Sequence, residues 1–127
     1  MKGKEQGMST WDTAIFNKDV NVDFLDELAS LDADERMEAV RDACLLAVDR
    51  DNASEDELLN GQAAATVAAI WAGAPFSAGD IADSYPFLRT TSAELDEKLV
   101  DAAVAILEDL AASDTEYDVD QFIEALS

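Results

Sequence analysis

Histidine is absent from this chain of 127 residues, and cysteine occurs only once, at Cys44. Without histidine there is no Ser-His-Asp or Cys-His catalytic group, no HExxH zinc site, and no iron site of two histidines and a carboxylate. A single thiol also excludes an intramolecular disulfide and a cysteine-rich zinc site. Because Cys44 lies among apolar neighbours in the middle of an expected helix, we predict a buried, unreactive thiol.

Proline and glycine are also scarce, with two and five copies, which argues against a loop-rich or all-β fold. No stretch has the period-two alternation of a β-strand, and no nucleotide-binding glycine motif occurs. The longest apolar stretch, residues 63–72, is interrupted by Thr66 and is too short to span a membrane. The N-terminus lacks the apolar segment of a secretory signal. These absences predict a helical, cytoplasmic protein.

Positive charge is the third shortage, because 8 Lys and Arg stand against 29 Asp and Glu, for a formal net charge of −21. Binding to nucleic acid or to an anionic membrane needs Lys and Arg, so we expect neither partner. Some basic residues also have an acid one helical turn away, as Arg36 has Asp32. A basic protein is the partner that this charge favours, because opposite potentials steer encounter.

Apolar residues make up 49% of the chain, which is enough to supply a core for one domain. A first helix is predicted from Val20 to Ala29. A second begins after Asp32 and a third after Ser54, since each has a glutamate three residues later in a capping-box pattern. The third helix is rich in alanine and ends at Gly73. Its small side chains on most faces predict a central position among the helices.

Two further helices complete the predicted fold. One begins after Thr91, with Glu94 at capping-box distance, and ends near Ala112. A short last helix follows Asp118. The fold class is therefore predicted as all-α, a single-domain irregular bundle of about five helices with a central Ala-rich helix. We place this domain at residues 9–127 and interpret residues 1–8 as a disordered leader or a cloning remnant, with Met8 a candidate start.

Residues 74–90 break the helical period, and we expect an ordered loop with one helical turn at 78–84. Aromatic residues gather around this segment: Trp71, Phe76, Tyr85 and Phe87. Because Trp and Tyr often anchor interfaces, these four residues are candidates for partner binding. The alternative is that they pin the loop to the core of the bundle.

Two of the predicted helices carry acids with the same spacing. Intervals of 3, 4 and 7 residues separate Glu35, Glu38, Asp42 and Asp49, and likewise Glu94, Glu97, Asp101 and Glu108. The earlier set lies opposite an expected apolar stripe of Met37, Val40, Cys44, Ala47 and Val48. These acids are either the solvated faces of two amphipathic helices, the trace of an internal duplication, or an acidic surface. For such a surface, Glu35, Glu38 and Asp42 are the candidate partner-binding residues.

The acidity also allows two interpretations without a charged partner. In the first, the acidity is an adaptation to salt or for solubility. The excess of Asp (18) over Glu (11) and the rarity of Lys are what such an adaptation would produce. A carboxylate-dependent divalent-metal site is chemically possible as well. However, the acidic runs that begin at Asp49 and Asp114 have no glutamate at the twelfth position of a calcium-binding loop.

The beginning of the chain resembles a known family. From Trp11 it reads Trp-Asp-Thr-Ala-Ile-Phe-Asn-Lys-Asp, followed by Asp23 and Phe24. This is similar to the opening of the domain of unknown function 4259 family, small bacterial proteins that typically begin with Trp-Gly-x-Gly-x-Phe-Asp-Asn-Asp. The Ala-rich helix that ends in glycine looks like the middle helix of that family. The resemblance implies a small helical protein and supplies no activity.

The matching segment departs from the family pattern where Asp12 and Ala14 replace glycines and Lys18 replaces an asparagine. Two interpretations of this segment remain open. Its aromatic residues pack over the first helix, which Asp19 or Asn21 caps, or Trp11, Asp12 and Asp19 line a surface that recognises a partner. For the whole chain we expect no enzymatic activity and no cofactor. The expected function is binding of a basic protein, with an immunity or inhibitor protein as one form of it.

Overall fold

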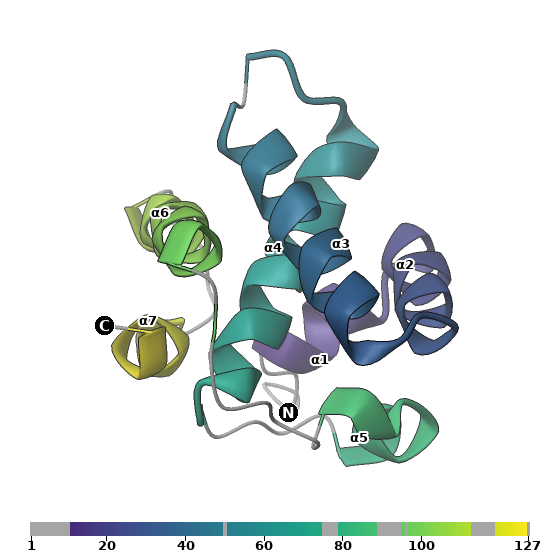
Figure 1. Cartoon of the computed structure of the whole chain (residues 1–127). Helices are drawn as coiled ribbons and strands as arrows, with labels where there is room; N and C mark the ends of the chain where they lie inside the picture. The colour runs from purple at the N-terminus through teal and green to yellow at the C-terminus, as the bar shows by residue number, and fades with distance from the viewer. Residues whose placement is uncertain are drawn as a thin grey trace, which may run out of the picture.

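The computed structural model describes residues 11–49, 51–74, 79–88, 95, 97–112 and 119–126, and the fold consists of helices (Figure 1). The elements are α1 (Trp11–Phe16), α2 (Asp19–Ala29), α3 (Ala33–Val48), α4 (Glu55–Trp71), α5 (Gly79–Ser84), the 3-10 helix η1 (Pro86–Leu88), α6 (Glu97–Ala112) and α7 (Asp120–Leu126). Five of the seven α-helices in the described ranges have seven or more residues, and these ranges contain no strand. The predicted all-α class is confirmed.

The two predicted helix starts in the middle of the chain are confirmed by their caps. The Asp32 side chain accepts a hydrogen bond from the backbone N–H of Glu35 at 2.9 Å and begins α3. Ser54 and Glu57 form a reciprocal capping box at the start of α4, with bonds of 3.1 and 2.9 Å. Each cap satisfies backbone donors that the first helical turn leaves without an intrahelical partner.

The end of α4 is fixed by Gly73, as predicted. Gly73 has a φ of 111°, a left-handed conformation that glycine adopts without steric cost. The N–H of Ala74 donates to the carbonyl of Ala69 at 2.9 Å, and the N–H of Gly73 donates to that of Ile70 at 3.0 Å. This pair of bonds is a Schellman motif, which turns the chain away from the helix axis.

Helix α4 is central, as its alanines predicted. It packs against α1, α2, α3, α6, α7 and η1, and every residue from Ala63 to Trp71 is buried. Helix α3 comes very close at Gly61, where a Cβ atom would lie 2.1 Å from the Cβ of Ala47. In Figure 1 the end of α3 and the start of α4 extend together beyond α2 and α6.

Helix α1 was not predicted, since we placed the first helix at residues 20–29, which corresponds to α2. Its Trp11 donates from Nε1 to the hydroxyl of Thr66 on α4 at 2.8 Å, and Thr66 donates to the carbonyl of Gln62. The Asn21 amide donates to the carbonyl of Ile15 at 2.8 Å and joins α1 to α2. Six residues are too few to show a clear helical period, so the sequence pattern did not reveal α1.

The helices after α4 follow the prediction where the structure describes them. Helix α5 corresponds to the expected single turn, and α7 to the expected last helix. Helix α6 buries Leu99, Ala102, Ala103, Ile106 and Leu107. The expected capping box at residues 91–94 and the leader at residues 1–8 lie outside the described residues.

Candidate partner-binding surface

The predicted acidic residues of α3 lie on the surface. Glu35, Glu38 and Asp42 are exposed, and so is Asp49 just after the helix. Because residues three, four and seven apart share one face of a helix, these carboxylates form a line along α3. On α6, Glu97, Asp101 and Glu108 are exposed at the matching intervals, while Glu94 lies outside the described residues. Both helices therefore present acidic faces to solvent.

Arg36 does not form the predicted pair with Asp32. Its guanidinium donates to the carbonyl of Leu28 in the last turn of α2 at 2.9 Å and to that of Leu31 just after α2 at 2.7 Å. The Cζ atom also lies 4.8 Å from the centre of the Phe87 ring, in a cation–π arrangement. The prediction was wrong because carbonyls at a helix end compete with an exposed carboxylate for a cation. This arginine thus holds the fold together and offsets little of the acidic surface.

The family-like segment packs into the core. Trp11 is 6% exposed and Asp12 is fully buried, whereas Asp19 is exposed in the first turn of α2. No cap is made by Asp19, because the cap position of α2 is Lys18 and its side chain makes no capping bond. The burial favours the packing interpretation for Trp11 and Asp12, and we leave both out of the surface proposed below.

The aromatic residues of the irregular segment mainly attach it to the bundle. Trp71 and Phe87 are buried, and the indole N–H of Trp71 donates to the carbonyl of Phe87 at 3.0 Å. Tyr85 is half-buried and packs edge-on against Phe87, with ring centres 6.1 Å apart. Phe76 lies outside the described residues. These contacts support the interpretation that the aromatics pin the segment to α4.

The hydroxyl of Tyr85 donates a hydrogen bond to the carboxylate of Asp26 on α2. This bond, reinforced by burial and by the negative charges of Asp26 and Asp23, raises the pKa of Tyr85 to about 12. Each cause favours the neutral phenol. Tyr85 therefore keeps its proton at neutral pH, and its described role is a link between α2 and the α5–η1 segment.

Cys44 is fully buried, as predicted, and burial raises its pKa to about 12. Its thiol lies 3.9 Å from the carbonyl oxygen of Gly61, within the range of a weak S–H donor. A thiol with so high a pKa has almost no reactive thiolate at neutral pH. Cys44 is therefore a packing residue between α3 and α4.

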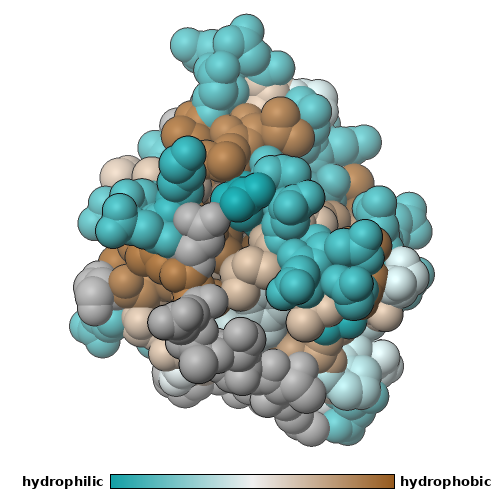
Figure 2. Space-filling view, in the orientation of Figure 1, coloured by the Kyte–Doolittle hydropathy of each residue, from teal (hydrophilic) through white to brown (hydrophobic). Residues whose placement is uncertain are grey.

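An exposed apolar cluster that the sequence pattern does not reveal lies at the end of α3 and consists of Leu45, Leu46 and Val48. These side chains are 44%, 54% and 45% exposed. Figure 2 shows hydrophobic surface over this end of the molecule, bordered by hydrophilic side chains. We had assigned Val48 to the buried stripe, which is wrong because α3 extends beyond the helices that would cover it (Figure 1).

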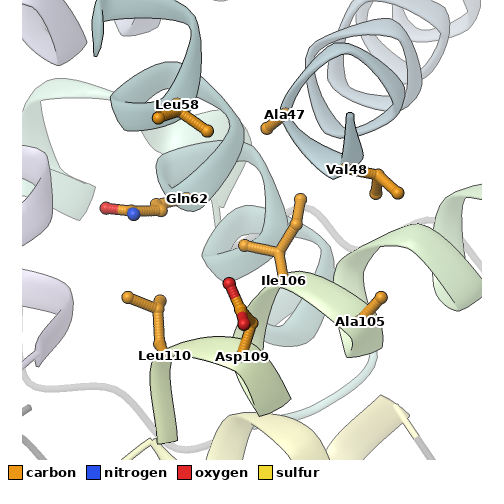
Figure 3. A pocket seen from close by; sticks show the side chains of 8 residues that line it. All are labelled: Ala47, Val48, Leu58, Gln62, Ala105, Ile106, Asp109 and Leu110. Atoms are coloured by element: carbon orange, nitrogen blue, oxygen red, sulfur yellow. The ribbon is translucent and has the colours of Figure 1, made fainter. Parts of the chain in front are cut away.

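A groove of about 360 Å³ lies next to this cluster, between α3, α4 and α6. Eight residues line it: Ala47, Val48, Leu58, Gln62, Ala105, Ile106, Asp109 and Leu110. Figure 3 shows the carboxylate of Asp109 directed into the groove between the side chains of Ile106 and Leu110. The lining is mainly aliphatic, with one carboxylate and one amide. Such a surface suits an apolar side chain that has a cation beside it.

The described ranges contain neither a group of metal ligands nor a membrane-spanning helix. No three carboxylate or thiol side chains in these ranges group closely enough to hold a metal ion. The acidic run at 114–118 lies outside them. No helix in the described part of the chain has the length and apolar character needed to cross a membrane.

The comparisons with known proteins identify a family. The family model described as Domain of unknown function (DUF4259) matches residues 9–125, nearly the whole chain. No curated protein and no solved structure gave a significant match. The chain therefore belongs to the DUF4259 family, as the Trp11 segment and the Ala-rich helix indicated.

Proposed function

We propose that this member of the DUF4259 family is a non-enzymatic, cytoplasmic protein–protein interaction module that binds a basic protein. One concrete form is an immunity or inhibitor protein that covers the basic surface of a nuclease-like toxin. The proposal concerns recognition by charge and shape, and it assigns no catalytic residue.

The observation that carries the proposal is the exposed line of carboxylates on α3, formed by Glu35, Glu38 and Asp42. With a formal net charge of −21, the chain attracts a basic protein over distances longer than a contact. The two arginines of α3 offset this line only in part. Arg36 is turned toward backbone carbonyls, and Arg41 pairs with the adjacent Asp42 at 3.7 Å.

The test is affinity capture from a nuclease-treated lysate of the source organism with two charge-neutralised variants. The first carries Glu35→Gln, Glu38→Gln and Asp42→Asn on α3. The second carries Glu97→Gln, Asp101→Asn and Glu108→Gln on α6. The two variants remove the same number of exposed charges from different helices, so they have the same net charge. Any difference in binding between them therefore comes from the position of the charges.

We expect the wild-type protein to retain one basic protein stoichiometrically and the α3 variant to lose it, while the α6 variant keeps it. Loss with the α6 variant alone would move the binding surface to α6. A smear of proteins that washes away with salt, equally for all three baits, would contradict the proposal. That result would favour the acidity as an adaptation of the solution properties.

A further inference from the structure

We propose that the groove between α3, α4 and α6, together with the apolar cluster of Leu45, Leu46 and Val48, is the docking site for an amphipathic basic helix of the partner. This inference rests on the proposed function and adds to it the place of contact and the form of the partner. The partner helix has apolar residues on one face, spaced to fill the groove, and Lys or Arg along both edges of that face.

The apolar part of the site is longer than a single pocket. Val48 lines the groove and belongs to the exposed cluster, and a second hollow lies over Asp42, Leu45 and Leu46. Residues 42 to 48 span about 9 Å along α3, and the exposed Leu45 lies one turn from Val48, which links the two hollows on this side of the helix. An extended element such as a helix contacts this whole length, whereas a compact small molecule fills only the groove.

Acidic groups flank both halves of the site. Asp109 is directed into the groove from α6 (Figure 3), Asp42 borders the second hollow, and Asp49 follows Val48. Leu45 lies on the acidic line of α3, since it is three residues from Asp42 and four from Asp49. Apolar contacts bordered by carboxylates match a helix with leucine-like residues on one face and cations at its edges.

Charge also decides between a foreign partner and a second copy of this chain. Association of two copies through this face would bring two chains of net charge −21 together and place like charges beside the apolar contacts. A basic helix removes both the exposed apolar area and part of the charge repulsion. Either occupant would bury the three half-exposed side chains, so the charge is what favours the basic partner over self-association.

The test measures binding of a defined probe to the full chain. The probe is a fluorescent Leu/Lys peptide of about 15 residues, with leucines at helical spacing on one face and lysines elsewhere. The control peptide has the same composition in an order that places no two leucines on one helical face. Fluorescence anisotropy at two salt concentrations gives Kd for each peptide.

Two protein variants locate the binding on the surface. Leu45→Ser with Leu46→Ser removes apolar area, and Leu45→Met with Leu46→Met is the control that keeps it. All four changes fall on exposed side chains, so we expect the fold to be retained. Asp42→Asn with Asp109→Asn removes charge at the site, and Asp23→Asn with Glu27→Gln removes the same charge from α2.

We expect the amphipathic peptide to bind more tightly than its control, and the serine variant to weaken its binding about tenfold. The methionine and α2 variants should bind like the wild type. If both peptides bind with the same Kd, and only added salt or the removal of charge weakens their binding, the groove is not the docking site. Recognition by charge would then stand alone. A concentration-dependent dimer in sedimentation velocity that the serine variant abolishes would assign this face to a second copy and overturn the inference.

Discussion

At the scale of single residues, Gly61 decides how closely α3 and α4 approach each other. A Cβ atom at this position would lie 2.1 Å from the Cβ of Ala47 and 3.1 Å from the carbonyl oxygen of Ala43. Neither neighbour has a flexible side chain that could move away. In the sequence, Gly61 is a glycine inside a helix, which usually costs stability. Only the packing against α3 explains why a glycine stands there.

We predict that Gly61→Ala lowers the free energy of unfolding by about 1 to 2 kcal/mol. Overpacking costs about 1 to 3 kcal/mol, and the better helix propensity of alanine returns somewhat less than 1 kcal/mol. Urea unfolding followed by circular dichroism measures the change. Adding Ala47→Gly to Gly61→Ala should relieve the clash, so the double variant should lose less than the two single losses added together. A Gly61→Ala variant more stable than the wild type would contradict the close approach.

At the scale of elements, Arg36 joins three parts of the fold. It lies on α3, donates to the carbonyls of Leu28 in the last turn of α2 and of Leu31 just after α2, and packs over the Phe87 ring of η1. We predict that Arg36→Ala lowers the free energy of unfolding by about 2 to 3 kcal/mol, because hydrogen bonds of a charged group and a cation–π contact are lost together.

The control for this prediction is Arg36→Lys, which keeps the charge and loses the planar fork that reaches two carbonyls at once. We expect Arg36→Lys to lose roughly half as much stability as Arg36→Ala in the same urea experiment. Equal stability of the lysine variant and the wild type would show that the charge alone matters. Equal loss in both variants would show that the guanidinium geometry accounts for the whole effect.

Element boundaries could be predicted where side chains mark them. The start of α3 is marked by Asp32, the start of α4 by Ser54 and the end of α4 by Gly73. Each boundary depends on a local hydrogen-bonding pattern that involves few neighbours. What covers an element could not be predicted in this way. Val48 shares the apolar spacing of α3, yet it is exposed because no described helix lies over that end. A periodic pattern shows which residues share a face and leaves open what that face meets.

The candidate site shows the same limit at the scale of the whole molecule. The acidic line on α3 could be read from spacing, because exposed carboxylates need no neighbour to explain them. The groove could not, since one of its walls comes from α6, which is far in the sequence from the α3 and α4 residues that form the other walls. Trp11 and Trp71 also seemed equally suited to an interface and a core, and only the tertiary packing places both in the core.

The net charge of −21 makes a prediction about the molecule as a whole. Like charges on one compact chain repel, and unfolding relieves this by separating them. Raising the ionic strength from about 0.01 M to 1 M shortens the screening length from about 30 to 3 Å. We therefore predict that the urea midpoint rises with NaCl across this range. Chloride is preferable to sulfate here, because sulfate also strengthens apolar burial and would raise the midpoint for another reason.

A variant with fewer exposed acids provides the control for the salt dependence. Neutralising Glu35, Glu38 and Asp42 on α3 together with Asp101 and Glu108 on α6 removes five exposed charges. If repulsion sets the salt response, this variant should be more stable than the wild type at low salt and should gain less from NaCl. A flat response in both proteins would mean that the acids are far enough apart to cost little, which removes the main support for a salt adaptation. The acidic line of α3 would then need a partner to explain it, and the capture and peptide experiments would become the deciding measurements.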